Sequence, residues 1–420
     1  MLEKVRYCLW KRCWSLANDM KTDILIVGCG VAGLYCALNL PQNKKVTIVT
    51  KNEAQKSDSF LAQGGICVLR DEKDFNDFFE DTMRAGHYEN NPESVNIMIQ
   101  SSQDVIGDLV SCGVRFEKDG EQFTYTREGA HSRPRILFHE DETGKEITSH
   151  LLETARNRKN ITLIENFVMV DLICDGNTCN GIIGHDKENN YRSITADYTV
   201  LATGGIGGLF KHSTNYRHLT GDALALAMKY KIKLQHIDYI QIHPTTLYSK
   251  KDGREFLISE SVRGEGAIFD EMKKENSEHV WLSMAPIPEE EIKTHFPNIY
   301  QHCLEEGYDI TKEPIPVVPS QHYFMGGIDV DCYSKTSMER LYAVGETACN
   351  GVHGKNRLAS NSLLESLVFA KRAAKHIVNN YSQIETRAEY TVDASLYEGY
   401  QEKYKELVLT AIEKEKNSHE

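Results

Sequence analysis

Of the 420 residues, 40% are hydrophobic and 26% charged, so the chain can bury a large core, and its length favours two domains over one. The formal net charge of -13 argues against nucleic acid or an anionic membrane as a partner, because either would favour a basic surface. No apolar run is long enough for membrane insertion across a bilayer. The eleven cysteines are odd in number and lack close pairs, which indicates reduced thiols in a cytoplasmic protein rather than disulfides or a zinc site.

Residues 1–19 differ in character from the rest of the chain. They mix four basic residues with two tryptophans and two cysteines, and their apolar stretches are too broken for a signal peptide. Met20 would be a natural start just before the first strand. We therefore treat residues 1–19 as an extension of unknown role.

The first predicted elements are a strand over 24–27, a glycine turn and a helix that runs through Leu40. In this order Gly28 permits a tight turn, Gly30 lets the backbone approach a phosphate, and Gly33 lets the helix pack close to the strand. The first helical amides, at Val31 and Ala32, would then face a dinucleotide pyrophosphate. Alone, the motif is a weak signal, because an ordinary strand–turn–helix can also contain it.

A second strand at 46–49 completes a βαβ unit, and two residues that follow it, Thr50 and Lys51, are candidate cofactor contacts. They stand where nicotinamide-binding folds often carry an acidic residue that binds ribose, which argues against a simple NAD site. A polar loop with Ser59 then ends in Ala62-Gln63-Gly64-Gly65, also candidate contacts. Residues 77–86 and 92–112 are predicted helices.

Two later strands also end in glycine. The predicted strand 198–201, which follows one at 160–163, leads into Ala202-Thr203-Gly204-Gly205, and the strand at 341–344 leads into Gly345 and Glu346. Ligands bind at the carboxyl ends of strands in open α/β sheets, so these distant turns can meet around one long cofactor. Their spacing suits FAD better than a nicotinamide, with Glu346 accepting a hydrogen bond from ribitol or ribose. The alternative for Glu346 is a surface carboxylate.

The pattern changes between residues 237 and 323, where glycine-marked strand ends disappear and Lys, Glu and isolated aromatics dominate. We expect an α/β fold: a Rossmann-like FAD-binding domain at 20–236 and 324–390, an inserted α+β capping domain at 237–323, and a C-terminal helix within 391–420. Strong helical patterns cover 362–378 and 397–416.

Four polar clusters could carry chemistry, and none contains a credible metal site because their histidines are isolated. Arg357 can bind one carboxylate through two parallel hydrogen bonds, while His243, His322 and Ser259 can hold another. Together they predict a dicarboxylate site, although each histidine taken singly is as well explained as a structural residue. Three prolines at 314, 316 and 319 predict a stiff, extended approach to His322. The clusters are 126–132, 243–245, 259–266 and 321–323.

These motifs together resemble the flavoprotein family of succinate dehydrogenase, fumarate reductase and L-aspartate oxidase, from Lys21 to the C-terminal helix. Within it the chain is most similar to compact L-aspartate oxidases without the usual C-terminal helical domain. Asp58 stands where succinate dehydrogenases carry a histidine linked to flavin, which implies noncovalent FAD. The matching segments are Ala62-Gln63-Gly64-Gly65, His243-Pro244-Thr245, Arg263-Gly264-Glu265-Gly266, Gln321-His322-Tyr323 and 358–363.

The resemblance implies oxidation of L-aspartate to iminoaspartate with oxygen or fumarate as acceptor, the first step of quinolinate and NAD biosynthesis. Quinolinate synthase is then a candidate partner. Glu128 matches the acid that contacts the substrate ammonium, and Glu260 lies in the third cluster with Ser259. Asp222, Ser362 and Leu363 match flavin-contacting positions. Two alternatives remain: a soluble fumarate reductase, which Glu128 disfavours, and an inactive FAD-binding remnant.

The main departure from the family follows Phe269, where the chain runs directly into Asp270. Relatives carry an additional segment here, with an arginine that transfers a proton in catalysis, so we expect an internal deletion and impaired turnover. Arg254 lies in a polar turn that looks solvated and is no obvious replacement. Smaller departures are Ala223, which would be strained if its φ were positive, and Lys355, which could point to solvent.

Overall fold

The computed structural model describes residues 20–418 except 250–252, 270–277, 385–389 and 391. The expected extension at 1–19 and residues 270–277, which follow Phe269, lie outside this part. Within it no helix is long and apolar enough to cross a membrane.

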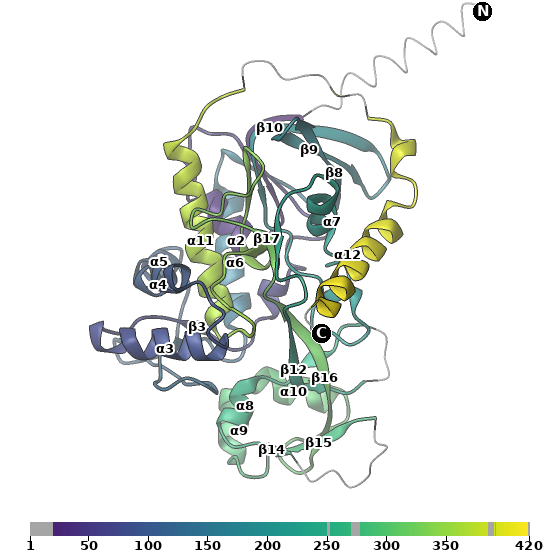
Figure 1. The fold of residues 1–420 in the computed structure, drawn as a ribbon. Coiled ribbons are helices and arrows are strands. Elements are labelled where there is room, and N and C mark those ends of the chain that lie inside the picture. Colours follow the sequence, from purple (N-terminus) through teal and green to yellow (C-terminus); the bar gives the residue numbers. More distant parts are fainter. Residues whose placement is uncertain (1–19, 250–252, 270–277, 385–389, 391, 419–420) are drawn as a thin grey trace, which may run out of the picture.

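A seven-stranded sheet forms the upper part of the molecule, with strand order β7-β2-β1-β10-β9-β8 and β18 beside β10 (Figure 1). The strands β1, β2, β7, β10 and β18 run parallel, whereas β8 and β9 form an antiparallel extension. Such parallel strands are buried on both faces, which explains their nearly continuous apolar runs. The bounds are β1 Met20–Val27, β2 Val46–Val49, β7 Ile161–Ile164, β8 Phe167–Asp175, β9 Thr178–Asp186, β10 Tyr191–Leu201 and β18 Leu341–Ala343.

The two faces of this sheet bury separate cores. Ile24 and Ile26 of β1 pack into the core on one side, whereas Leu25 and Val27 pack into the core on the other. This alternation follows from the two-residue period of a strand. Helices α2 (Val31–Leu38), α6 (Thr143–Asn157) and α11 (Asn361–Asn379) cover the first face, and α7 (Asp222–Lys229) and α12 (Tyr400–Asn417) cover the second.

Three further helices lie on the outer side of α11 (Figure 1): α3 (Phe75–Ala85), α4 (Pro92–Gln100) and α5 (Ser102–Ser111). The sequence predicts a single helix over 92–112, and this prediction is wrong. Ser101 follows the last residue of α4 and precedes the first residue of α5, so the segment forms two helices. Apolar residues face the core on both sides of the break, and for this reason the periodic pattern did not reveal it.

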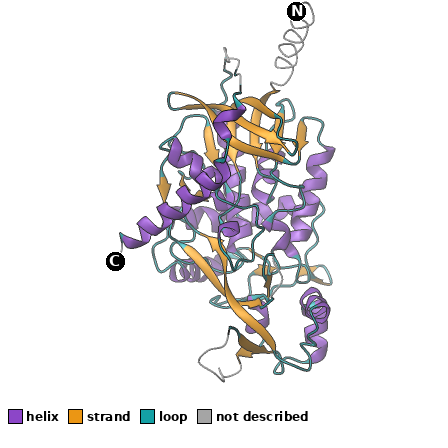
Figure 2. Ribbon diagram, turned by 90° about the vertical axis from the view of Figure 1, so that its right-hand side faces the viewer, coloured by secondary structure: helices purple, strands orange, loops and turns teal. Residues whose placement is uncertain are grey.

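Residues 240–324 form what we call the lower lobe, which projects below the main body (Figures 1 and 2). Its five-stranded sheet has the order β13-β12-β16-β15-β14, and its own core gathers residues such as Leu282, Ile299 and Val317. We propose that it is the inserted domain expected at 237–323. Its elements are β12 Ile240–Leu247, β13 Phe256–Leu257, α8 Glu260–Gly264, β14 Ile268–Phe269, β15 Val280–Ser283, α9 Glu289–His295, α10 Pro297–Glu305 and β16 Ile315–Phe324.

Strand β16 contains Pro316 and Pro319, so the predicted extended approach to His322 is a strand of the lobe sheet. A small sheet of order β11-β17-β19 lies where the chain enters and leaves the lobe. Two-stranded ribbons complete the fold. The remaining bounds are β3 Ile66–Cys67, β4 Lys118–Asp119, β5 Gln122–Phe123, β6 Ile136–Leu137, β11 Leu234–Gln235, β17 Gly327–Asp329 and β19 Ala348–Cys349.

Candidate active site

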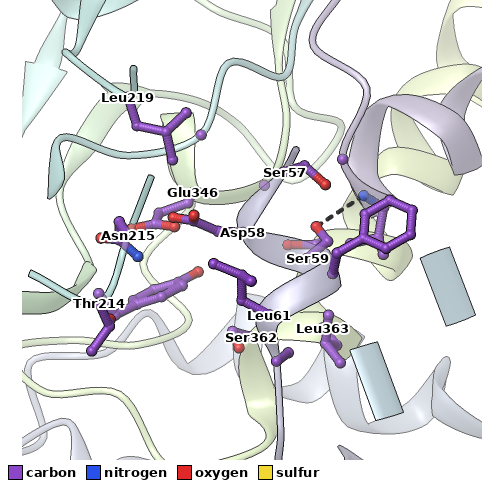
Figure 3. A pocket seen from close by; sticks show the side chains of 18 of the residues that line it. Ser57, Asp58, Ser59, Leu61, Thr214, Asn215, Leu219, Glu346, Ser362 and Leu363 are labelled. Carbon is purple, nitrogen blue, oxygen red and sulfur yellow. Dashed lines mark hydrogen bonds between the residues drawn. The ribbon is translucent and has the colours of Figure 1, made fainter. Parts of the chain in front are cut away.

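A long cavity lies where the upper sheet meets the lower lobe. It contains about 2210 Å³ of empty space, open solvent at its mouth included. Its walls come from the carboxyl ends of β1 and β10, from the loop that carries Asp58, and from β16 with His322. Figure 3 shows part of the wall, with Asp58 and Glu346 side by side. This is the position at which open α/β sheets bind ligands.

The cavity brings together nearly all residues that the sequence assigns to a cofactor. Of that set only Gly33 and Gly205 lie outside the described wall. The residues that line it are Gly28, Gly30, Val31, Ala32, Thr50, Lys51, Ser59, Ala62, Gln63, Gly64, Gly65, Ala202, Thr203, Gly204, Asp222, Glu346, Ser362 and Leu363.

The two exceptions act by leaving room for other groups. A Cβ atom on Gly33 would lie 2.2 Å from the Gly28 carbonyl oxygen, so its absence lets α2 pack against the glycine turn. A Cβ atom on Gly205 would lie 2.3 Å from Oε1 of Glu346, so its absence makes room for that carboxyl group. Gly28 has φ 119°, and a Cβ atom there would lie 1.9 Å from the Ala202 carbonyl oxygen, so only glycine fits.

Several of the lining groups contact each other directly. The amide of Val31 donates to Oγ of Ser59 at 3.1 Å (Figure 3), and Nζ of Lys51 lies 2.7 Å from Oδ2 of Asp222. Asp222 begins α7, and the left-handed residue before it is Gly221, with φ 68°. Ala223 therefore sits inside the helix without the strain expected from the sequence.

Two partly buried carboxyl groups, those of Asp58 and Glu346, face the middle of the cavity (Figure 3). The Tyr216 amide donates to Oδ1 of Asp58 at 3.0 Å, but Oδ2 has no hydrogen-bond partner among the described residues. Burial raises the pKa of Asp58 to about 7, although the Tyr216 amide opposes the shift. Burial, and then the charge of Asp58, raise the pKa of Glu346 to about 8. The sequence predicts Glu346 as a hydroxyl acceptor, and its partly buried position in the wall suits that role.

Further buried polar atoms of the wall lack partners within the described chain: Oγ of Ser57, Oε1 of Gln63 and Oδ1 of Asn215. Buried polar groups normally form hydrogen bonds, so these atoms indicate that a polar ligand completes the site. Together with the glycine turn at the start of α2, they fit a long cofactor with hydroxyl and phosphate groups, such as FAD. No group of three or more described His, Cys, Asp or Glu side chains could hold a metal ion, and the described cysteines are free.

The six residues that the sequence assigns to catalysis also line this cavity: Glu128, His243, Ser259, Glu260, His322 and Arg357. His243 lies on β12 and His322 on β16, and their ring centroids are 5.2 Å apart at 65°. The pairing of these strands is irregular between His243 and Thr246. Such β-bulges redirect side chains next to active sites, which explains how His243 reaches the cavity from a sheet strand.

Both histidines are neutral at pH 7. Burial, and then the charges of Arg263 and Arg357, lower the pKa of His243 to about 3. Burial and Arg357 hold the pKa of His322 well below its usual value. Arg357 contributes a positive charge beside both histidines; its Nε donates to Gln241 at 3.1 Å and its Nη1 to Ser362 at 3.0 Å.

Glu128 is buried on the other side of the site. It accepts hydrogen bonds from Oγ of Ser360 at 2.6 Å and of Ser261 at 2.9 Å. Burial nevertheless raises its pKa, so a cationic group on a ligand would compensate for the buried charge. Ser259 begins α8, and its Oγ accepts the Ser261 amide at 3.3 Å, which leaves this hydroxyl partly engaged. Glu260 lies 3.7 Å from Arg263.

The sequence missed several residues of the wall. Thr214 and Asn215 hold β16 at His322: Oγ1 of Thr214 lies 2.8 Å from Nδ1 of His322, and Nδ2 of Asn215 donates to its carbonyl oxygen at 3.2 Å. The expectation that Arg254 is solvated is wrong, because it is half-buried in the wall near the Tyr216 ring. These residues follow no recognisable pattern, since they meet only through the contact of loop and lobe. Lys355 is mostly exposed, as expected, and lies 3.8 Å from Glu89.

Comparisons with known proteins identify the family of this chain. A family profile described as "FAD binding domain" matches residues 23–269 and 266–363. The two matches meet at the point where the sequence predicts a deleted segment. The L-aspartate oxidase of Clostridium perfringens is 50% identical over 383 residues, covering 86% of this chain and 87% of that protein. The L-aspartate oxidase of Clostridium acetobutylicum is 47% identical over 392 residues, covering 87% and 90%.

The alignment with the C. perfringens protein has more positions than the 86% of the 420 residues that it covers, so the relative has residues for which this chain has no counterpart.

Among solved structures, a variant of E. coli quinol fumarate reductase matches with a TM-score of 0.83 at 25% identity, over 93% of this chain and 75% of that one. Mycobacterium smegmatis Sdh1 matches with a TM-score of 0.76 at 29% identity, over 91% and 72%. The cofactor is FAD, and the chain belongs to the L-aspartate oxidase family of FAD-dependent oxidoreductases.

Proposed function

We propose that the protein catalyses the FAD-dependent oxidation of L-aspartate to iminoaspartate. The observation that carries the proposal is the position of the buried Glu128 carboxyl in the same cavity wall as Arg357 and the neutral pair His243 and His322. A carboxylate beside a dicarboxylate site favours a ligand that also carries a cation, and L-aspartate has that combination.

In this proposal Arg357 binds one substrate carboxylate, and its charge is the main electrostatic contribution. His243 and His322 donate hydrogen bonds to the second carboxylate. Glu128 binds the ammonium group. FAD, when bound, accepts the hydride from C2 of the substrate, so the protein contributes orientation and charge neutralisation. We propose oxygen or fumarate as the electron acceptor.

We further propose that FAD is bound noncovalently. The family resemblance implies that Asp58 stands where succinate dehydrogenases carry a flavin-linked histidine, and a carboxyl group is not expected to form that bond. The glycine turn at Gly28 and Gly30, the unpartnered oxygens in the wall and Glu346 would hold the cofactor. The product would enter quinolinate and NAD synthesis in the cytoplasm, with quinolinate synthase as a partner.

The segment missing after Phe269 limits this activity. In relatives it supplies the arginine that transfers a proton, and losing a positioned acid–base group typically lowers the rate by about 10²–10⁴. We therefore propose slow turnover. The two alternatives are a fumarate reductase-like enzyme, which the fold match to E. coli quinol fumarate reductase favours, and an FAD-binding protein without turnover, which the missing segment favours.

An anaerobic titration distinguishes the proposed activity from its two alternatives. Purified protein is loaded with FAD, and the flavin absorbance is followed while L-aspartate or succinate is added. Bleaching by L-aspartate but not by succinate supports the proposal. Bleaching by succinate supports the fumarate reductase alternative, and a flavin that neither compound reduces after long incubation supports the inactive one.

A further inference from the structure

Arg135 is the core of a charged cluster behind the active site. Its side chain is completely buried, and it pairs with two buried carboxylates: Nη2 lies 2.9 Å from Asp74 and Nη1 lies 2.7 Å from Asp81. Burial alone would raise the pKa of Asp81, but hydrogen bonds from Ser132 and Arg135 hold it below its usual value. A buried charge so fully paired has a fixed orientation.

This fixed guanidinium determines the protonation state of His131. Nη1 of Arg135 lies 3.0 Å from Nδ1 of His131. Because a guanidinium has only donors, Nδ1 must be the acceptor and carries no proton. Burial lowers the pKa of His131 to about 4, so the ring is neutral and its proton is on Nε2. That nitrogen lies 3.0 Å from the carbonyl oxygen of Ala359 and donates to it.

The hydrogen bond falls on a strained part of the substrate site. Ser360, the next residue, has φ 60°, a conformation that non-glycine residues adopt only when their surroundings hold them. Its Oγ accepts the Gly65 amide at 3.1 Å and donates to Glu128, and its carbonyl oxygen accepts the Cys67 amide at 3.1 Å. Arg357 lies just before this segment, and α11 begins just after it.

We propose that His131 is a positioning residue: through the tautomer set by Arg135, it holds the Ala359–Ser360 peptide in the conformation that presents Arg357 and Glu128 to the substrate. Ala359 and Ser360 are among the described residues of the cavity wall, whereas His131 is not, so it acts through the peptide. The inference rests on the proposed function, since it assumes that Arg357 binds a substrate carboxylate.

The test uses FAD-loaded protein and measures the dissociation constant of succinate from the change in flavin absorbance, which requires no turnover. His131→Leu removes the hydrogen bonds that the ring forms with the Ala359 carbonyl oxygen and with Nη1 of Arg135, and we expect the dissociation constant to rise about tenfold, equivalent to ~1.4 kcal/mol. His131→Gln can still accept from Arg135 and donate to Ala359, so it should restore binding to within about twofold of the original chain.

The matched control is Asp171→Asn. Asp171 is also buried and bonded to a lysine and a tyrosine, Lys229 at 2.6 Å and Tyr230 at 2.8 Å, but it lies outside the described cavity wall. The Asp171→Asn substitution should lower the unfolding temperature without changing the dissociation constant of succinate. The inference is overturned if His131→Leu binds succinate as tightly as the original chain does. It is also overturned if Asp171→Asn loses as much succinate affinity as His131→Leu.

The 15N NMR spectrum of the unmodified protein tests the same point without a variant. We expect Nδ1 of His131 to be unprotonated, and a proton there also overturns the inference. Failure of the proposed function has a different signature, since succinate would bind while L-aspartate leaves the flavin oxidised. A chain that binds neither dicarboxylate overturns both.

Discussion

The hydroxyl oxygen of Thr214 lies 2.8 Å from Nδ1 of His322, so a loop of the main body holds a side chain of the lower lobe. The contact is part of a longer junction, because Oγ of Ser213 donates to Oε1 of Gln321 at 2.6 Å. His322 is neutral, with its pKa well below the usual value because of burial and the nearby Arg357. A fixed partner at Nδ1 orients Nε2 towards a ligand.

Thr214→Val keeps the shape of the side chain but removes this hydrogen bond. We expect succinate to bind about fivefold more weakly, since a typical hydrogen bond contributes about 1 kcal/mol. Titration of the FAD-loaded protein measures this. Thr154→Val is the control, because Oγ1 of Thr154 donates to the carbonyl oxygen of His150 within α6, away from the described cavity wall. Equal affinities in the two variants would contradict the role of Thr214.

Glu128→Gln should separate L-aspartate from succinate. The amide can contact both Ser261 and Ser360, accepting from one hydroxyl and donating to the other, but it loses the charge that would pair with an ammonium group. Hydrogen bonds to charged groups contribute about 1.5–3 kcal/mol, so L-aspartate affinity should fall roughly 10- to 100-fold while succinate affinity holds or improves. The two dissociation constants are compared in one protein preparation. An equal loss for both ligands would show that Glu128 has no role in recognising the ammonium group.

Asp58→Asn should change how the stability of FAD-free protein depends on pH. The pKa of Asp58 rises from 3.8 to about 7 in the folded chain, so its contribution is complete below about pH 4 and is lost as the pH rises to about 7. Asparagine does not ionise, so the variant should gain stability over the original chain across that range, up to ~4 kcal/mol. Urea unfolding at about pH 5 and about pH 8 measures the difference, and a gain that is the same at both values would contradict the raised pKa.

The sequence predicts the βαβ core closely because short apolar runs end in glycine there. The strand at 46–49 is found with those bounds, and the helix expected at 362–378 is found at Asn361–Asn379. The strand expected at 198–201 begins earlier, at Tyr191, because its first half pairs with β9, a contact that local pattern does not reveal.

Fewer of the residues that line the site could be predicted from the sequence. Residues within glycine or His-Pro-Thr motifs have recognisable spacing, and His243 and Arg357 do line the cavity. Thr214, Asp141 and Arg254 reach it only because the lower lobe folds back onto the main body. Their side chains occur in ordinary polar loops, so tertiary contact alone gives them a role. The orientation of His131 likewise depends on Arg135, whose burial the sequence does not indicate.

Asp141→Ala should loosen the lower lobe. The carboxylate of this main-body residue accepts the backbone amides of Asn298 at 3.3 Å and Ile299 at 2.9 Å, and so caps the start of α10 in the lobe. Loss of a helix N-cap costs about 0.5–2 kcal/mol, so hydrogen exchange at the first turn of α10 should quicken about 2- to 30-fold. Asp141→Asn keeps an acceptor and is the control. Unchanged exchange in the alanine variant would show that other contacts hold the lobe.

Restoring the family segment between Phe269 and Asp270 should raise both stability and turnover. Ile268 of β14 is 57% exposed and Trp281 of β15 is 41% exposed, so a segment that covers them would bury apolar surface and raise the unfolding temperature. The family resemblance implies that this segment also carries a proton-transferring arginine, so kcat with L-aspartate should rise by about 10²–10⁴. A second insertion with glutamine in place of that arginine separates the two effects, since it should gain the stability without the rate. Equal rates from both insertions would mean that the missing segment shapes the lobe and that proton transfer depends on residues already present in the chain.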